Sequence, residues 1–525
     1  MAQGDVTQEV KNVVIVGGGT AGWLAAGVLA SKLHSSINVT LIESPNIPTI
    51  GVGEGSWPSL RDTLIDIGIS ESDFLTTCSA SFKQGSSFVN WRNATDKPHI
   101  YYHPFTVPNG YNELDIHACW QTFAKDDEYQ DAFSLQAALC HAGRAPKQLS
   151  TPEYAHVLNY GYHFDASALA LLLKKHCTKK LNVHYQQAHI AQVNTCENGF
   201  IQFVTTGDGN SIKGDLFIDC SGQQGVLIDK HYKVPWQSVE HTLINNRAVA
   251  VQVPYSENND AISSTTIATA QSNGWTWDIG LQHRRGIGLV YADTLTSEEA
   301  AIDTLLNQVS LRYPENIHNS DVRTLRFSPG YRQQFWVKNC LSLGMSSGFV
   351  EPLEASAIAM VELGLRMLCD AFPQNRRHME LVAKRYNSRF TYRWQRVIDF
   401  LKLHYVLSDR TEPYWLAQRE PSSIPGSLEE LLEIWRYQSP SRLDLIENEE
   451  IFPSASYQYV LYGMGFNTAI PATAMTAETA RKAQALRNKL VQTQQAYLAG
   501  LPTNRALLTQ LSAQYSKEHA HAAIR

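Results

Sequence analysis

The first forty-three residues combine a strand, a glycine-rich turn, a helix and a second strand, an order that few folds accommodate. Lys11–Val16 is a short apolar run, and the stretch from Trp23 to Leu33 has helical character. A second apolar run, Asn38–Ile42, follows the helix and ends at an acidic residue. This order predicts a βαβ unit and therefore an α/β fold built on a parallel, Rossmann-like sheet.

The turn between the first strand and the helix has the GxGxxG spacing of a dinucleotide-binding loop. The first glycine permits the tight turn, the second lets the backbone approach a pyrophosphate, and the third lets helix and strand pack closely. The amides that open the helix would face the phosphates, and the acidic residue after the second strand would accept from a ribose hydroxyl. The cofactor-binding candidates are Gly17, Gly19, Thr20, Ala21, Gly22 and Glu43. The alternative is a glycine-rich turn in a plain α/β domain.

Two later segments have the pattern of further pieces of the same domain. Gly214–Gly225 is a buried strand running into a glycine turn, and Asn339–Ala357 is a strand, a glycine loop and a helix start. Gly344 and Ser347 in the second loop are additional cofactor-binding candidates. Because both segments lie far from the first glycine turn in the sequence, the nucleotide-binding domain is predicted to be discontinuous.

A third glycine-rich segment, Ile50–Gly55, follows the second strand. Gly51 and Gly53 allow a left-handed backbone or a close approach to a ligand. The segment is either a mobile loop or a strap that lies against the cofactor.

These pieces predict two regions. Residues 1–375 form the discontinuous nucleotide-binding domain, with core pieces at about 8–95, 165–230 and 330–375 and inserted strands on the substrate side. Residues 376–525 form a mostly helical substrate-binding region. Its expected helices are Arg376–Leu407, Ser427–Tyr437 and Ala477–Leu498.

Composition excludes several classes of function. The net charge of −6 gives no reason to expect nucleic acid or an anionic membrane as a partner. No apolar run reaches the roughly 18–20 residues that span a bilayer, and the polar start is unlike a secretory signal. The eight cysteines include no CxxC pair, so neither a zinc site nor another metal site is predicted. We expect a reduced, cytoplasmic protein.

Several residues are candidates for chemistry on the substrate side. Trp275 and Trp277 point the same way if their segment is extended, and they offer a large paired indole surface. Lys83 lies among apolar residues, where composition alone favours a surface lysine; if it is buried, it becomes a nucleophile or donor. His103 and Phe105 are either core or the lining of an aromatic pocket.

A helix start near residue 356 carries one more candidate. Glu354 is either a capping or dipole partner of this helix or a catalytic group. The small residues that follow it, Ser356 and Ala357, expose amides that can bind an anion.

Taken together, these residues resemble the flavin-dependent tryptophan halogenases. The resemblance covers most of the chain in order and rests on the segments GGGTAGWLAA, IGVGEGSWPSL, SFKQGSSFVNW, FIDCSG, GWTWDIGLQHRRGIGLVY and SGFVEPLEASAI. It implies non-covalent FAD, used as FADH2 and delivered by a separate flavin reductase, with chloride or bromide as co-substrate. Oxygen, reduced FAD and halide then generate hypohalous acid, which reaches a separate substrate site. A homodimer is the family expectation.

The resemblance also implies roles for the candidates. Lys83 would bind the hypohalous acid, or form a haloamine, and direct the halogen to the ring. Glu354 would orient this lysine or help to remove the ring proton. Ser356 and Ala357 would bind halide, and the two tryptophans would stand between the flavin and the substrate.

The chain departs from the family pattern in places that bear on the substrate. Gly280 stands where the family has proline. The tyrosine pair and the tryptophan that grip free tryptophan have no match near Phe452, although His103 and Phe105 match the residues that sandwich the indole. The resemblance thus implies an indole-type ring: bare indole, a substituted indole or a peptide-bound tryptophan.

Two other functions stay open at this point. A flavin-dependent aromatic hydroxylase would share the glycine motif, but it would not need Lys83 and would bind its own reductant. A flavoprotein that only binds a ligand would need neither Lys83 nor Glu354.

Overall fold

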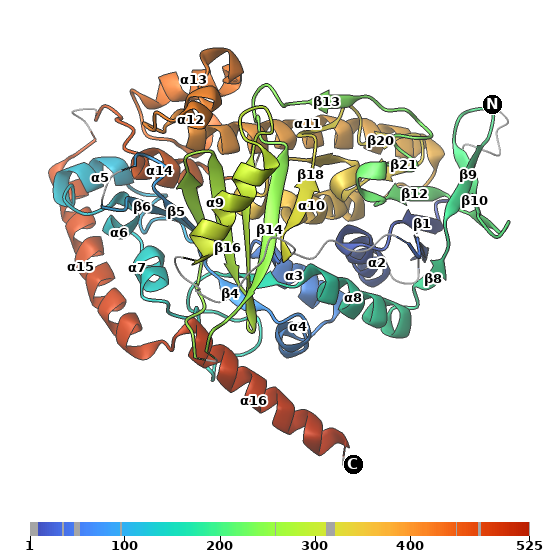
Figure 1. Ribbon diagram of the computed structural model, residues 1–525, viewed down its shortest axis with the longest axis horizontal. Coiled ribbons are helices and arrows are strands. Elements are labelled where there is room, and N and C mark those ends of the chain that lie inside the picture. Colours follow the sequence, from blue (N-terminus) through green and yellow to red (C-terminus); the bar gives the residue numbers. More distant parts are fainter. Residues whose placement is uncertain are drawn as a thin grey trace. The chain divides into compact units, whose positions relative to one another are not determined.

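The structure is a computed structural model that describes residues 9–33, 36–46, 53–94, 97–257, 259–310, 321–447, 449–470 and 474–523. The chain forms two compact units, each assembled from three separate segments; their elements are labelled in Figure 1. The first unit contains Met1–Cys78, Phe164–Val239 and Ser328–Trp394. The second contains Ser79–His163, Glu240–Phe327 and Gln395–Arg525.

A six-stranded sheet organises the first unit, in the order β20-β21-β12-β1-β2-β8. The strands are β1 (Asn12–Val16), β2 (Asn38–Glu43), β8 (His184–Gln187), β12 (Leu216–Asp219), β20 (Trp336–Val337) and β21 (Cys340–Ser342). Neighbours pair in parallel except β20 with β21. The predicted βαβ unit is confirmed, and β12 and β21 come from the two later segments.

The helices of this unit follow from the same sequence signals. β1 is an almost wholly buried apolar run, as expected of a strand inside a parallel sheet. The helix α2 (Thr20–Lys32) is buried from Gly22 to Ala30 and packs against its neighbours in the unit (Figure 1). Those neighbours are α3 (Ser59–Ile67), α8 (Ala166–Lys180) and α10 (Ser356–Asp370), and α4 (Glu71–Thr77) packs on α8.

Two small sheets complete the first unit. One contains β9 (Ile190–Thr195), β10 (Ile201–Thr206) and β11 (Ser211–Lys213); the other contains β13 (Trp236–Ser238), β19 (Gly330–Arg332) and β22 (Gly348–Phe349). The Asn339 side chain accepts from the Ile201 amide at 2.9 Å and donates to its carbonyl at 2.8 Å. This amide therefore ties the β9–β11 sheet to the residue just before β21. The short strand β3 (Glu54–Gly55) also belongs to this unit.

A seven-stranded sheet organises the second unit, in the order β18-β14-β17-β16-β15-β5-β6. Its strands are β5 (Gly85–Val89), β6 (Ile100–Pro104), β14 (Arg247–Pro254), β15 (Thr266–Gln271), β16 (Gly274–Gly280), β17 (Arg284–Tyr291) and β18 (Arg323–Arg326). Helix α9 (Glu298–Ser310) packs on β14 and β17 (Figure 1). Its buried residues Ala301, Leu305 and Val309 join the apolar cluster formed by these strands.

Short helices and a short strand pair surround this sheet. Strand β4 (Ser81–Lys83) pairs antiparallel with β7 (Gly161–Phe164). The helices between β6 and β7 are α5 (Ile116–Phe123), α6 (Tyr129–Ala132) and α7 (Gln136–His141). Asp115 begins α5 as an N-cap, because its carboxylate accepts from the Ala118 amide.

The C-terminal part of the chain is helical, as predicted. The helices are α11 (Arg376–Val406), α12 (Pro413–Gln418), α13 (Gly426–Trp435), α14 (Ser454–Gly463), α15 (Ala477–Gly500) and α16 (Asn504–Ala523). Three of them, α11, α13 and α15, match the predicted segments to within a few residues. Their apolar spacing was sufficient to locate them.

The limits of the first unit differ from the predicted limits of the nucleotide-binding domain. The first unit ends at Cys78 in its first segment and at Trp394 in its last. Residues 79–95 belong to the second unit because β5 pairs with β15 and β6. In the described part of the chain, no helix is long and apolar enough to cross a membrane.

Candidate functional site

The glycine turn after β1 is held by backbone contacts that leave no space for side chains. Gly17 has a φ of 121°, and a Cβ at this residue would overlap the carbonyl of Cys220. A Cβ on Gly22 would overlap the carbonyl oxygen of Gly17. The first and third glycines therefore do what the motif requires: one makes the turn and the other packs helix against strand.

The second glycine faces open space. Among the described residues, and apart from the adjacent backbone, no atom lies within 4 Å of the position that a Cβ on Gly19 would occupy, and Gly19 is the N-cap of α2. Gly19 has no side chain that could cap the amides of Thr20 and Ala21, and the helix dipole favours an anion at this N-terminus. The cradle fits a pyrophosphate.

Glu43 ends β2 beside this cradle. A Cβ on Gly18 would overlap its carboxylate, so the carboxylate lies directly over the glycine turn. Lys174 of α8 approaches Glu43 Oε2 to 2.8 Å, and its ammonium lies 3.9 Å from the centre of the Tyr185 ring. The ion pair therefore holds the carboxylate at the glycine turn. Lys174 was missed because nothing in its local sequence marks it.

The loops after β12 and β21 open at the same edge of the sheet. Gly344 has a φ of 68°, and a Cβ on it would lie 2.8 Å from the Cβ of Ala21. Ser347 donates to the Gly344 carbonyl at 2.8 Å and so closes that loop. The structure therefore brings these two candidates next to the start of α2. Gly53 also has a left-handed φ of 98°, whereas Gly51 lies outside the described residues.

Asp219, at the end of β12, is a residue that the sequence analysis missed. Its carboxylate accepts from the amides of Leu227 and Ile228 at 2.7 and 2.8 Å and from the amide of Ser221 at 3.0 Å. It fixes the glycine turn that follows FIDCSG. An acid directly after a buried strand was the available signal.

Glu354 and Ala355 have a strained backbone before α10. Their φ values are 65° and 54°, in the left-handed region that non-glycine residues rarely adopt. Ala355 is the N-cap of α10, and Glu354 lies directly before it. The Glu354 carbonyl accepts from the Trp57 indole at 2.8 Å. Strain of this kind persists where the surroundings enforce it, and it gathers at functional sites.

The first turn of α10 carries the two anion-binding candidates. Ser356 is buried and Ala357 is exposed, and α10 has no side-chain cap. The amides of this turn thus have the same uncapped arrangement as those of α2.

Lys83 is fully buried in the second unit, so the surface-lysine interpretation is wrong. It ends β4, and its ammonium lies 5.5 Å from the centre of the Phe105 ring. The short strand is anchored along its length: the Ser81 hydroxyl donates to the Gly280 carbonyl, and the Gln84 amide donates to the Ser264 carbonyl. A cation over an aromatic face in a dry interior is an unusual and directed arrangement.

Two of the aromatic candidates, His103 and Phe452, belong to one group. His103 bonds the Ser456 hydroxyl through Nε2 at 2.8 Å, and its ring centre is 6.4 Å from that of Phe452. Phe452 stacks on Phe400 with centres 3.8 Å apart. The structure therefore joins residues from β6, α11 and the segment before α14 into one aromatic cluster.

Trp275 and Trp277 are extended and point the same way, as predicted, but both are almost fully buried. They share one face of the sheet with Phe88, Tyr101 and His103 through the pairing of β16, β15, β5 and β6. Trp275 packs on Trp91 with ring centres 5.9 Å apart. The pair is part of an aromatic layer and not an open surface.

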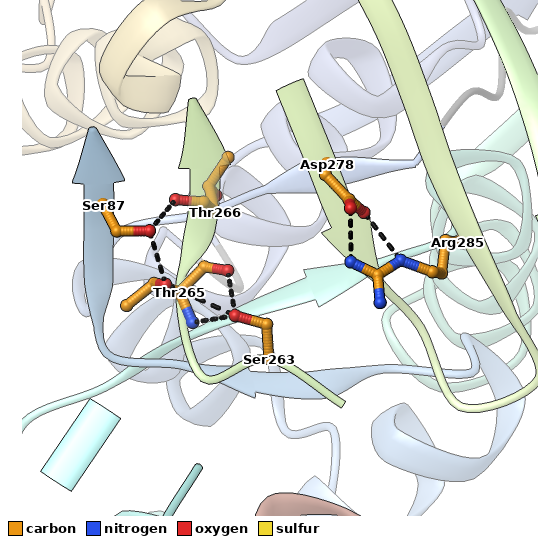
Figure 2. Close-up of polar contacts among 6 residues, drawn as sticks. All are labelled: Ser87, Ser263, Thr265, Thr266, Asp278 and Arg285. Atoms are coloured by element: carbon orange, nitrogen blue, oxygen red, sulfur yellow. Dashed lines mark hydrogen bonds and ion pairs between the residues drawn. The ribbon is translucent and has the colours of Figure 1, made fainter. Parts of the chain in front are cut away.

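The opposite face of β16 carries an ion pair that the sequence analysis missed. Asp278 and Arg285 are both buried and form a two-pronged pair, seen on the right of Figure 2. Nearby, Ser87 bonds Thr265 at 3.1 Å and lies against Thr266 (Figure 2). The sequence signal for this pair was the alternation of side chains between the two faces of adjacent hairpin strands, which places cross-strand residues in contact.

These features define a dinucleotide-binding α/β protein with a buried lysine among aromatic side chains. The profile of the tryptophan halogenase family matches residues 12–479. A tryptophan halogenase from Shewanella frigidimarina is 44% identical, with a TM-score of 0.93 over 97% of this chain and 98% of that one. Tryptophan 6-halogenase ThaL of Streptomyces albogriseolus is 30% identical over 96% of this chain and 98% of its own.

BrvH, a flavin-dependent halogenase from Brevundimonas sp. BAL3, is 29% identical, with a TM-score of 0.83 over 96% of this chain and 99% of that one. The chain therefore belongs to the tryptophan halogenase family. It is a flavin-dependent halogenase that uses reduced FAD and halide. Membership favours this function over the aromatic hydroxylase and over a flavoprotein without turnover.

Proposed function

We propose that this halogenase transfers a halogen to an indole-type ring and that Lys83 directs the transfer. Bound reduced FAD supplies the oxidation of halide by oxygen to hypohalous acid. The observation that carries the proposal is the complete burial of Lys83 with its ammonium facing Phe105. A buried amine binds the acid by hydrogen bonds or forms a haloamine, and water is kept from the reactive halogen.

Three further groups act together with Lys83 in the proposed reaction. Glu354 orients the reacting groups or accepts the ring proton, and its strained backbone supports a fixed function. The uncapped first turn of α10, at Ser356 and Ala357, binds the halide. Trp275 and Trp277 form a wall that separates the place where the acid is made from the place where it is used.

FAD binds at the glycine turn of the first unit, and a separate flavin reductase supplies it in reduced form. The residues that hold it are Gly17, Gly19, Thr20, Ala21, Gly22, Glu43, Gly51, Gly53, Gly344 and Ser347. The protein forms a homodimer in the cytoplasm.

The ring is of the indole or tryptophan type. Relatives such as ThaL are named tryptophan halogenases, and His103 with Phe452 provides an aromatic surface on which a flat ring can stack. Free tryptophan would also need partners for its ammonium and carboxylate, and the tyrosine pair that fills this role in the family has no match here. A bare indole, a substituted indole or a peptide-bound tryptophan therefore fits better.

One assay tests the whole proposal. The protein is supplied with FAD, a flavin reductase, bromide and a panel containing indole, substituted indoles, free tryptophan and a tryptophan peptide. A bromine isotope doublet in the product mass is expected with the indoles. Replacing Lys83 by methionine is expected to lower bromination by about 100-fold or more, while hypobromous acid still accumulates.

Lys147 provides the matched control. It is also a buried lysine over aromatic rings, 5.6 Å from the centre of Phe82 and 5.4 Å from that of Tyr160. Lys147→Met removes a buried ammonium without touching Lys83, so folded variant protein should brominate normally. Normal bromination by Lys83→Met would show that the lysine role is wrong. A gain of one oxygen in the product would contradict the halogenase reaction itself.

A further inference from the structure

His163 lies beside Lys83 on the same face of a small antiparallel ladder. Ser81 pairs with His163, and Lys83 pairs with Gly161. Cross-strand partners and residues two apart share a face, so the side chains of Ser81, Lys83 and His163 lie on one side. Lys83 and His163 are diagonal neighbours, within reach of a long side chain.

The imidazole is anchored at one nitrogen only. His163 is fully buried, and its Nε2 lies 2.8 Å from the hydroxyl of Thr266. Its Nδ1 has no hydrogen-bond partner among the residues that the structure describes. Buried polar atoms without hydrogen-bond partners are rare in native proteins, so the Nδ1 of His163 needs a structural or functional explanation.

The charges around the ring keep it neutral. Burial lowers the pKa of His163 well below its usual range, and the positive charges of Lys83 and Arg285 lower it further. Asp278 pairs with Arg285 and holds that guanidinium in place (Figure 2). A neutral imidazole that donates through Nε2 to Thr266 presents a bare lone pair at Nδ1.

We propose that His163 is a positioning residue for Lys83, whose N–H it accepts at Nδ1 during halogen transfer. This inference rests on the proposed role of Lys83 and adds the residue that orients its amine. In the proposed arrangement the Thr266 hydroxyl accepts from Nε2, and the bare Nδ1 accepts one N–H of Lys83. The remaining side of the amine is thereby turned toward the halogen of the hypohalous acid.

Two substitutions of His163 separate this role from simple packing. The amide of asparagine can place its oxygen near the position of Nδ1, whereas that of glutamine reaches the position of Nε2. His163→Asn therefore keeps the acceptor and loses the bond to Thr266. His163→Gln keeps the bond to Thr266 and loses the acceptor.

The measured quantity is the fraction of hypobromous acid that ends in bromoindole, in the full chain with FAD, a flavin reductase, bromide and indole. We expect His163→Gln to lower this fraction about tenfold or more, with hypobromous acid formed at the normal rate. His163→Asn should stay within about threefold of the parent. A larger loss in His163→Asn than in His163→Gln would overturn the proposal, because the bond to Thr266 would then matter more than the acceptor at Nδ1. Equal losses in the two variants would also overturn it, because the packing of the ring alone would then explain them.

His117 serves as the control, since it is another buried histidine whose pKa burial lowers, to about 4. It belongs to α5, not to the β4–β7 ladder, and stacks on Tyr462 with ring centres 4.2 Å apart. His117→Asn should leave the fraction unchanged. If either His163 variant fails to fold, Thr266→Val tests the bond between Thr266 and His163 Nε2 instead. This variant keeps His163 and should lower the fraction of hypobromous acid that ends in bromoindole. An unchanged fraction would count against the proposal.

A second measurement is independent of turnover. In protein labelled with ¹⁵N in its histidine rings, His163 should be neutral, with the proton on Nε2 and a bare Nδ1. The Nδ1 signal should move when Lys83→Met removes the donor. A proton found on Nδ1, or a signal indifferent to Lys83, would refute the inference. Absence of bromoindole from the parent enzyme would instead count against the proposed function.

Discussion

Gly288 on β17 is the residue whose replacement by alanine is expected to disturb the tryptophan pair most directly. A Cβ at this residue would overlap Cη2 and Cζ2 of Trp277 and would lie 2.7 Å from the carbonyl oxygen of Val249. Gly288 and Trp277 are cross-strand partners in the middle of the seven-stranded sheet. Neither the ring nor the β14 backbone has room to withdraw, because both are buried.

The size of the effect follows from two opposing contributions. At an unobstructed strand position, glycine to alanine stabilises by about 0.4–1 kcal/mol, because the unfolded chain loses freedom. Overpacking a core costs about 1–3 kcal/mol, and here the clash includes a backbone oxygen. We expect Gly288→Ala to lower the free energy of unfolding by about 1–2 kcal/mol after both effects.

A double-mutant cycle with Trp277→Ala tests this reasoning. Removing the buried indole alone should cost about 3–5 kcal/mol. In the double variant the added methyl group partly fills the vacated space, so the total loss should be smaller than the sum by about 1 kcal/mol. Urea unfolding followed by far-UV circular dichroism measures all four proteins. Additive losses, or a Gly288→Ala midpoint equal to the parent's, would show that the contact does not govern this position.

Two further predictions concern buried charge. Asp278→Asn removes the carboxylate charge that pairs with the buried guanidinium of Arg285, and it should lower the free energy of unfolding in urea by about 3–5 kcal/mol. A loss below about 1 kcal/mol would mean that water reaches the pair. Burial raises the pKa of Glu362 from 4.5 to about 7 although Ser59 and Thr63 donate to it. The folded state therefore holds this proton more tightly, and stability falls as pH rises from about 4.5 to 7. Glu362→Gln should remove up to about 3 kcal/mol of that decline, seen as a flatter profile of unfolding free energy against pH.

The parts of the fold that were predictable have short-range causes. The glycine spacing after β1 specifies the turn, because Cβ atoms at Gly17 and Gly22 would strike backbone. The long C-terminal helices follow from apolar periodicity. The alternation of Trp275 and Trp277 follows from the period of a strand. Each of these inferences needs only a few neighbouring residues.

The parts that were missed depend on strand register. Lys83 is buried because β4 pairs with β7, a segment far away in the sequence, and composition alone pointed to the surface. The Asp278–Arg285 pair requires knowledge of how β16 and β17 align. Lys174 meets Glu43 only because α8 packs beside the parallel sheet. The alternating faces of two hairpin strands are a local signal for the Asp278–Arg285 pair, but the contacts of Lys83 and Lys174 leave no such signal in their local sequences.

The rigidity of the lysine position is also a product of long-range contacts. Strand β4 has three residues, too few to be stable alone. The Phe82 carbonyl accepts from the side-chain amide of Asn504 at 3.0 Å, so the start of α16 holds β4 from one side. Ser81 holds it to the Gly280 carbonyl, at the end of the strand that carries the tryptophans.

Gly280, the residue that departs from the family pattern, is thus a structural anchor for the strand that presents the lysine. It is the last residue of β16, and its φ is not left-handed. A shift of β16 would move Ser81 through this hydrogen bond and with it Lys83, two residues away on the same face. The tryptophan strand and the lysine are therefore coupled through the backbone, and changes at one will be felt at the other.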